Sequence, residues 1–166
     1  MNDELIIRTA DIDDIATIGF LAQQIWPGTY QEILTPAQLE YMMDLIYSPD
    51  SLQQQMRNKH QFLIAELDEE PIGFASYSEL EEPGIYKLQK LYVHPKTQGK
   101  GIGKALVDFI IEQLPRPDAS ILRLNVNRYN KARQFYEKMG FVVTKEEDID
   151  IGNQYYMNDY VMEKAI

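Results

Sequence analysis

The chain has 166 residues, 45% of them hydrophobic and 25% charged, and it contains no cysteine. This length and composition suit one globular core, so we expect a single domain over residues 1–166 and exclude collagen-like, coiled-coil and disordered chains. The lack of cysteine excludes disulfides and a cysteine nucleophile, and two isolated histidines, His60 and His94, predict no metal site.

The charge of the chain is acidic but unevenly distributed. Sixteen Lys and Arg against 26 Asp and Glu give a net charge of −10, which argues against binding to nucleic acid or to anionic membranes. Between Ile85 and Val107 there is no acidic residue, and the lysines of that window are Lys87, Lys90, Lys96, Lys100 and Lys104. We therefore expect one basic patch for an anionic ligand and a cationic partner elsewhere.

The chain is expected to be cytoplasmic. Its N-terminus is acidic where a signal peptide would be basic and then apolar, and no run of 18 apolar residues occurs.

The N-terminal third is predicted to be mostly helical. Residues 5–9 form a predicted strand, after which Asp11 is expected to cap an amphipathic helix that Trp26-Pro27-Gly28 ends. Thr35-Pro36 and Ser48-Pro49 each place an N-cap residue before proline at the first helical position. They predict one helix to about Tyr47 and a shorter one after it.

The remaining two thirds alternate strands with two helices. Strands are predicted over residues 61–67, 72–80, 85–93 and 121–127, the first two forming a hairpin with a turn at 68–71. Apolar spacing predicts helices over 102–114 and 131–139, ending before Pro115 and at Gly140. Residues 141–151 and 154–163 predict a closing hairpin across Gly152-Asn153. This order indicates a mixed α/β fold with a mostly antiparallel sheet.

The segment LYVHPKTQGKGIGKAL, residues 91–106, has the composition of a phosphate-binding loop. A strand, a turn marked by proline, the glycines Gly99, Gly101 and Gly103, and a helix follow one another. Glycines let several N–H groups converge, and the helix N-terminus adds unpaired donors and the positive end of its dipole. The spacing matches neither a Walker A loop nor a Rossmann fingerprint. The alternative is a loop that only caps the helix.

Two segments resemble motifs of the GNAT superfamily of acyl-CoA-dependent N-acyltransferases. Gln98, Gly101 and Gly103 match its Q/R-x-x-G-x-G/A signature. The second match, to N-x-A-x-x-F-Y-x-x-x-G-F, comprises Asn130, Ala132, Phe135, Tyr136, Gly140 and Phe141. The resemblance covers essentially the whole chain. It implies the GNAT fold, a central twisted sheet of six to seven strands flanked by four to five helices.

The resemblance implies acetyl-CoA as the cofactor. Its pyrophosphate would lie on the loop that comprises Gln98, Gly99, Lys100, Gly101, Ile102, Gly103 and Lys104. The pantetheine arm would pair with main-chain groups of Leu91 and Val93, and Asn130 would bind its amides, because asparagine both donates and accepts hydrogen bonds. The alternative role of Asn130 is to cap the helix that follows.

The resemblance also implies direct attack of an amine on the thioester in a ternary complex, without an acyl-enzyme. A main-chain N–H near Val93 would stabilise the oxyanion. Tyr136 matches the family's general acid for the departing thiolate. Its alternative role is a core aromatic residue beside Phe135 and Met139.

The general base has no assignment from the sequence. Many family members carry a glutamate on the strand before the loop, where this chain has Lys87. An alkyl ammonium of pKa ~10 must still lose a proton, and Glu79, Glu32 and Tyr30 are the candidates. His94 precedes a proline in the turn and is predicted to be structural.

The acceptor is expected to be a small cationic amine such as a polyamine. In the family the N-terminal helices form one wall of the acceptor site, and aromatic rings with carboxylates suit a cation. The weak candidates for substrate binding are Trp26, Tyr30, Glu32 and Glu79, whose alternative role is packing or solvation. Residues 23–47 and 150–164 resemble bacterial polyamine-acetyltransferase-like members, which agrees with the acidic charge outside the basic patch. The expected partners also include a second copy of the chain in a homodimer. The alternatives are a protein N-terminal or lysine acetyltransferase, and a non-catalytic acyl-CoA-binding sensor or interaction module.

Overall fold

The computed structural model describes residues 4–166, which form two compact units. The first unit extends to Ser78 and resumes at Lys90–Gln113, and the second comprises Glu79–Gln89 and Leu114–Ile166. Strand β4 (Ile85–Val93) contributes residues to both units. None of the helices within residues 4–166 is long and apolar enough to cross a membrane.

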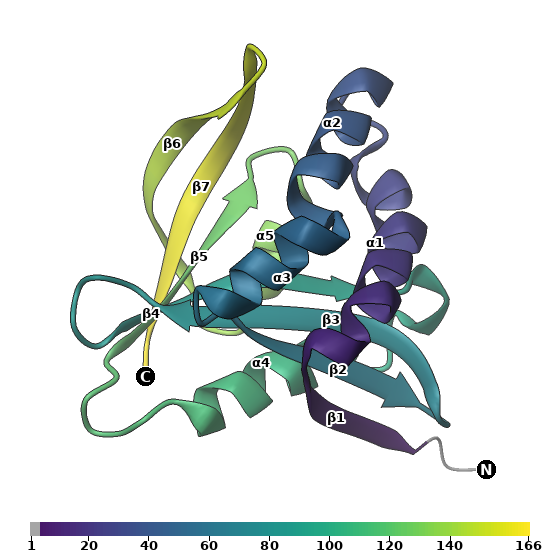
Figure 1. The fold of residues 1–166 in the computed structure, drawn as a ribbon. Coiled ribbons are helices and arrows are strands. Elements are labelled where there is room, and N and C mark those ends of the chain that lie inside the picture. The colour runs from purple at the N-terminus through teal and green to yellow at the C-terminus, as the bar shows by residue number, and fades with distance from the viewer. Residues whose placement is uncertain (1–3) are drawn as a thin grey trace. The chain divides into compact units, whose positions relative to one another are not determined.

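In the first unit, helices lie on both faces of the strands. Its strands are β1 (Leu5–Ala10), β2 (Gln61–Leu67), most of β3 (Glu70–Glu79) and the second half of β4, and its helices are α1 (Ile15–Tyr30), α2 (Pro36–Tyr47), α3 (Pro49–Arg57) and α4 (Ile102–Gln113). Strand β2 pairs antiparallel with both β1 and β3. Figure 1 shows α1, α2 and α3 on one face of these strands and α4 on the opposite face.

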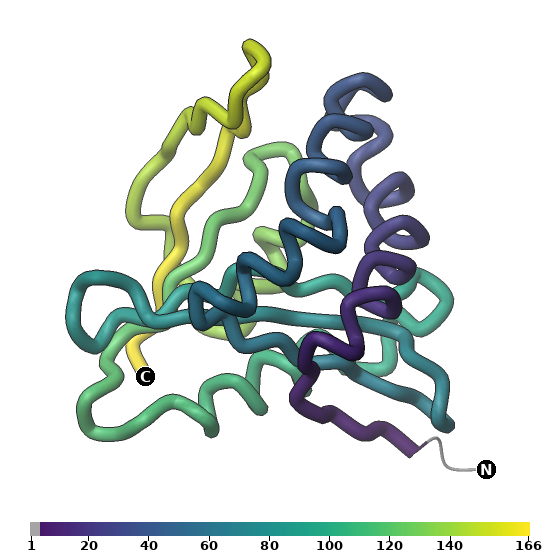
Figure 2. The backbone as a smooth tube through the Cα atoms, viewed as in Figure 1, coloured from purple at the N-terminus to yellow at the C-terminus, as the bar shows by residue number. Residues whose placement is uncertain are grey.

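The second unit is built on β5 (Ile121–Asn127), α5 (Ala132–Lys138), β6 (Val142–Gly152) and β7 (Tyr155–Ala165). Strand β7 pairs antiparallel with β5 and with β6, and Figure 2 traces β6 and β7 as one long hairpin. The first half of β4 pairs parallel with β5, from Ile85↔Ile121 to Leu88↔Leu124.

The strand order agrees with the predicted fold class. Within the described residues, seven strands follow the order β1-β2-β3-β4-β5-β7-β6, and five α-helices accompany them. Four of the strand pairs just named are antiparallel and one is parallel. The prediction of six to seven strands, mostly antiparallel, with four to five helices is therefore confirmed. A single domain over residues 1–166 stays a prediction.

The predicted helix starts are confirmed at two N-caps. The hydroxyl of Thr35 accepts a hydrogen bond from the N–H of Gln38 at 3.1 Å, and that of Ser48 accepts from Ser51 at 3.2 Å. In both helices proline occupies the first helical position, where its missing N–H would be unpaired in any case.

The predicted end of the first helix at Trp26-Pro27-Gly28 is wrong. Helix α1 continues through Pro27 to Tyr30, although proline deprives the carbonyl of Gln23 of its helical donor. The buried side chains of Trp26 and Tyr30 fix this last turn against the core, and the N–H of Gln31 still bonds to the Pro27 carbonyl at 2.9 Å. Packing of the two rings therefore outweighs the local cost of the proline.

The first hairpin turn is tighter than predicted, and the second is shifted by one residue. The turn between β2 and β3 consists of Asp68 and Glu69, and that between β6 and β7 consists of Asn153 and Gln154. All four residues have positive φ, between 51° and 71°, as a two-residue hairpin turn requires. Because these are not glycines, composition alone placed the turn boundaries one or two residues away.

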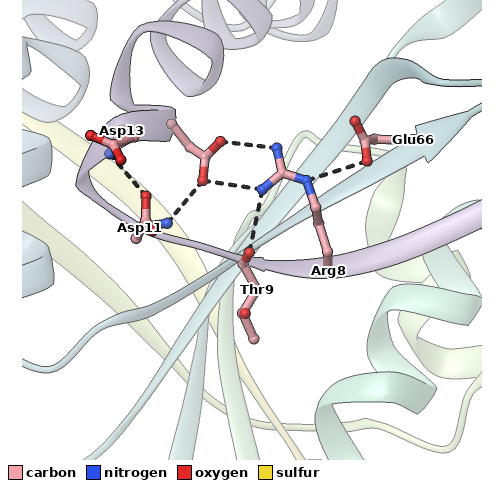
Figure 3. A network of polar contacts seen from close by, with 6 residues as sticks. Arg8, Thr9, Asp11, Asp13 and Glu66 are labelled. Carbon is pink, nitrogen blue, oxygen red and sulfur yellow. Dashed lines mark hydrogen bonds and ion pairs between the residues drawn. The ribbon is translucent and has the colours of Figure 1, made fainter.

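Arg8 of β1 ties the start of the first helical segment to the strands, as Figure 3 shows. Its guanidinium donates to both carboxylate oxygens of Asp14, at 2.9 and 3.1 Å, and to Glu66 of β2 at 3.2 Å. Asp11 and Asp14 form a capping box around the short 3-10 helix Ile12–Asp14, so Asp11 caps this turn and not α1 itself. The bond from Arg8 holds the pKa of Asp14 below its ordinary value.

Replacing Asp14→Asn should lower the free energy of unfolding at pH 7 by about 1 kcal/mol, the scale of a partly exposed ion pair. Because folding lowers the pKa of Asp14, its contribution is complete above the ordinary value of 3.8 and disappears as the pH falls through the folded value. Urea unfolding at pH 7 and pH 3 should show the difference from wild type shrinking at the lower pH. Asp13→Asn, one residue earlier, should cost less, and an equal loss would contradict this account.

Candidate functional site

The segment between β4 and α4 is a loop whose conformation requires two glycines. Gly99 has a φ of 85° and Gly101 a φ of 74°, which L side chains rarely adopt. A Cβ at either position would meet no atom within 4 Å. The requirement is therefore one of backbone conformation and not of crowding, and both glycines are exposed.

The loop leads directly into the N-terminus of α4. The first helical hydrogen bond joins the N–H of Ala105 to the carbonyl of Gly101 at 3.0 Å. The N–H groups of Ile102, Gly103 and Lys104 precede that bond, as the first donors of a helix do. Buried Ile102 anchors this turn. An anionic group at this helix N-terminus would be stabilised by the successive N–H donors and by the helix dipole.

The turn before the loop is held by His94. Its Nδ1 accepts a hydrogen bond from the N–H of Lys96 at 3.2 Å, and its carbonyl accepts from the hydroxyl of Thr97 at 2.9 Å. The structural role predicted for His94 is confirmed.

The predicted single basic patch is wrong for Lys90. Lys90 bonds to Gln55 of α3 at 2.5 Å and lies 5.4 Å from the centre of the Phe62 ring, on the face that carries α1, α2 and α3. Lys87 belongs to the second unit. Successive residues of a strand point to opposite faces, so Lys87 and Lys90, three positions apart on β4, point to opposite faces.

The lysines of the loop and α4 carry their charge on the surface. Lys104 pairs with Asp108 at 2.6 Å, and Lys96 pairs with Glu70 at 2.5 Å. All four side chains are largely exposed, so these ion pairs are weak. Either lysine can therefore leave its carboxylate partner and bind an anionic ligand instead.

Strand β4 approaches β3 closely just before the loop. A Cβ at Gly73 would lie 2.9 Å from the carbonyl oxygen of Tyr92, so this position has room only for glycine. The N–H of His94 donates to the carbonyl of Ile72 at 2.7 Å. Leu91 and Val93, predicted to offer main-chain groups to the cofactor, lie on this segment, and β4 extends five residues beyond its last pair with β5.

The aromatic residues predicted as an acceptor wall pack together in the core of the first unit. The indole N–H of Trp26 donates to the Tyr47 hydroxyl at 3.0 Å, and the hydroxyls of Tyr30 and Tyr92 lie 2.9 Å apart. Trp26, Tyr30 and Tyr47 are each at most 6% exposed. Burial raises the pKa of Tyr47 well above its ordinary value.

The two carboxylates predicted beside that wall are on the surface. Glu32 is exposed, following the end of α1, and Glu79 is exposed as the last residue of β3. Neither is a buried proton acceptor. Their proposed roles, like that of the aromatic wall, stay predictions.

In the second unit, Asn130 lies two residues before α5 and Tyr136 lies within it. The side-chain oxygen Oδ1 of Asn130 accepts from the N–H of Ala132 at 2.9 Å and closes a turn just before α5, whose N-cap residue is Lys131. That contact does not use its amide NH₂ donors. Tyr136 is 7% exposed, with its ring centre 5.2 Å from that of Phe135 and 5.7 Å from that of Phe141. Their roles toward a cofactor stay predictions.

A polar cluster in the second unit was missed from the sequence. It consists of Lys87, Asn125, Glu147 and Asp159, which we call the Lys87 cluster. The amide of Asn125 lies 3.3 Å from Asp159 and 3.4 Å from Glu147. Strand register puts all four side chains on one face. The available signal was an acidic residue, Asp159, within a strand of Tyr, Met and Val, where aspartate is uncommon.

No group of three or more His, Asp and Glu residues that could hold a metal ion occurs in the part of the chain from residue 4 to residue 166.

Comparison with known proteins gives one family match and several relatives. The acetyltransferase (GNAT) domain matches residues 30–156. A spermidine N(1)-acetyltransferase of Thermoplasma acidophilum is 29% identical over 164 residues, covering 95% of each chain. A peptidyl-lysine N-acetyltransferase of Salmonella typhimurium is 36% identical over 89 residues, which cover 52% of this chain and 54% of that protein.

The solved structures similar to this chain include PaiA N-acetyltransferase from Thermoplasma acidophilum in complex with coenzyme A. It is 28% identical, superposes with a TM-score of 0.82, and the match covers 98% of this chain and 99% of that one.

Proposed function

Because the chain belongs to the GNAT acetyltransferase family, it is an N-acetyltransferase that uses acetyl-CoA, and we propose that its acceptor is a small cationic amine such as a polyamine. The observation that supports acetyl-CoA binding is the conformation of the loop at Gly99 and Gly101. Both residues have positive φ, and the loop leads into the N-terminus of α4. A pyrophosphate there would accept hydrogen bonds from consecutive main-chain N–H groups and gain from the helix dipole. A relative 28% identical to this chain binds coenzyme A.

The remaining cofactor contacts that we propose come from main-chain and amide groups. The pantetheine arm would pair with the main chain of Leu91 and Val93, in the part of β4 beyond its register with β5. Asn130 would donate its amide NH₂ to the arm while its carbonyl oxygen stays on Ala132. Gln98, Lys100, Gly103 and Lys104 would complete the pyrophosphate contacts.

The reaction proposed is direct transfer within a ternary complex. The 166 residues contain no cysteine to form a thioester with the acyl group. The deprotonated amine would attack the carbonyl carbon of the thioester, and a main-chain N–H near Val93 would stabilise the oxyanion. Tyr136 would donate a hydrogen bond or a proton to the departing thiolate.

The polyamine acceptor is supported by charge and by one relative. A net charge of −10 attracts cations, and the spermidine N(1)-acetyltransferase matches this chain over 95% of both lengths. The peptidyl-lysine N-acetyltransferase matches only about half of each chain, at higher identity. A protein lysine acceptor is therefore the second candidate.

Gly101→Ala should weaken coenzyme A binding by about tenfold or more, because alanine is strained at this positive φ and shifts the main-chain donors. Isothermal titration calorimetry with coenzyme A measures the change. Gly28→Ala is the matched control, since Gly28 lies inside α1 with no atom within 4 Å of an added Cβ. Equal affinities of both variants and wild type would remove the loop from the proposed site.

Transfer of radiolabelled acetyl groups from acetyl-CoA should favour spermidine over a neutral-chain alkylamine, a lysine peptide and glutamate. The reason is that an acidic surface concentrates a polycation. A preference for the lysine peptide would support the second candidate, and a preference for glutamate would end the cationic-acceptor idea. Coenzyme A binding without transfer to any amine would indicate a non-catalytic binding module.

Tyr136→Phe should lower kcat by about 100-fold, within the range of general acid catalysis, while the affinity for coenzyme A stays unchanged. Steady-state kinetics and calorimetry on the same preparation separate these effects. Tyr129→Phe serves as the control, since Tyr129 is 71% exposed. An unchanged kcat in Tyr136→Phe would rule out the acid role.

A further inference from the structure

Gly73 is a buried glycine in β3 that a main-chain carbonyl of β4 approaches from the side. A Cβ built at Gly73 would lie 2.9 Å from the carbonyl oxygen of Tyr92 and 3.5 Å from the Cα of Val93. In a strand the Cβ points out of the pleat, toward one face of the sheet. The Tyr92 carbonyl is therefore displaced toward that face, whereas in a regular ladder it would lie between the strands.

The face toward which this carbonyl is displaced follows from strand alternation. Phe74 follows Gly73 in β3. Its ring centre lies 5.8 Å from that of Tyr47 in α2 and 5.6 Å from that of Tyr92. Phe74 thus points to the face that carries α1, α2 and α3, and Gly73 faces the opposite side, where α4 lies (Figure 1). The ring and the carbonyl of Tyr92 therefore extend to opposite faces.

The displaced carbonyl also determines the direction of the next N–H group. Tyr92 and Val93 are joined by a trans peptide bond, in which the C=O and the N–H point in opposite directions. Because the Tyr92 carbonyl turns toward the face of α4, the N–H of Val93 turns toward the face of α1, α2 and α3. The space above Gly73 thus sets the orientation of main-chain groups in the last part of β4.

Contacts on both sides hold this peptide unit in place. The ring centre of Tyr92 lies 5.5 Å from that of Trp26, and its hydroxyl lies 2.9 Å from that of Tyr30. After the peptide unit, the N–H of His94 donates to the carbonyl of Ile72 at 2.7 Å. All of these residues belong to the first unit. Aromatic packing and a main-chain bond therefore leave the peptide unit little freedom to rotate.

We propose that Gly73 and Tyr92 are positioning residues for the pantetheine arm of acetyl-CoA. This inference rests on the proposed function, in which the arm pairs with the main chain of Leu91 and Val93. Gly73 leaves the space into which the Tyr92 carbonyl turns, and the ring of Tyr92 fixes that turn from the opposite face. Main-chain hydrogen bonds are directional, so an arm that binds like an added strand depends on the orientation of these groups.

The arm and the pyrophosphate are held by separate parts of the first unit. The pyrophosphate loop takes its conformation from Gly99 and Gly101 and is anchored by buried Ile102. A change at Gly73 should therefore weaken the binding of a ligand that has the arm and spare a ligand that lacks it. A general loss of structure would weaken the binding of both.

The test compares two ligands by isothermal titration calorimetry. One is coenzyme A, and the other is 3′-phospho-ADP, which is coenzyme A without the pantetheine arm. In Gly73→Ala the added Cβ forces the Tyr92 carbonyl aside, so the affinity for coenzyme A should fall by about tenfold or more, while that for 3′-phospho-ADP stays within about twofold of wild type. Gly19→Ala is the matched control, since its Cβ would meet the carbonyl of Tyr47 at an ordinary 3.7 Å, and it should bind both ligands like wild type.

Variants of Tyr92 decide the question if Gly73→Ala does not fold. Tyr92→Ala removes the ring from the aromatic cluster and should show the same selective loss of coenzyme A affinity. Tyr92→Phe keeps the ring and removes only the hydroxyl that lies beside that of Tyr30. Its affinity for coenzyme A should therefore lie between those of Tyr92→Ala and wild type.

The inference is overturned if Gly73→Ala binds coenzyme A as tightly as wild type, or if it loses affinity for both ligands to the same extent. Either result in Tyr92→Ala has the same meaning. Failure of the proposed function looks different, because the wild-type protein would then bind no coenzyme A.

Discussion

The backbone conformation at Gly99 and Gly101 is the constraint on which the proposed chemistry depends. Two residues with positive φ turn the chain from β4 into α4, where the first N–H groups of the helix have no partner within the helix. Around this turn, His94, Thr97 and buried Ile102 hold the loop from both sides. The charged side chains nearby are paired only at the surface, so the main chain supplies the fixed part of the binding site and the lysines supply adjustable charge.

The features that the sequence predicts well are those encoded within a few residues. Thr35-Pro36 and Ser48-Pro49 identify two helix starts because an N-cap hydroxyl and a first-turn proline act over a single turn. The glycine loop is equally local. The end of α1 was mispredicted because its last turn depends on the packing of Trp26 and Tyr30 against residues far along the chain, including Tyr47 and Tyr92.

The candidate site is harder to predict from the sequence, because it too depends on contacts between residues that are far apart in the chain. Sequence proximity suggested that Lys87 and Lys90 belong with the loop, yet strand alternation and packing give Lys90 to α3 and Lys87 to a cluster with Asp159. Asp159 follows Lys87 by 72 positions, and only the pairing of β5 with β4 on one side and with β7 on the other brings their strands together.

The acidic strand β6 has a consequence for how the protein behaves at high concentration. β6 stands last in the strand order, and its exposed residues include Glu146, Asp148 and Asp150. The outer edge of a terminal strand is a template on which a further chain can add by main-chain hydrogen bonding. Arg128 pairs with Glu146 and Asp148, and Lys145 pairs with Glu147, but the acidic residues outnumber these cations. The remaining negative charge repels a second copy of the strand and so protects the sheet against open-ended fibrillar growth.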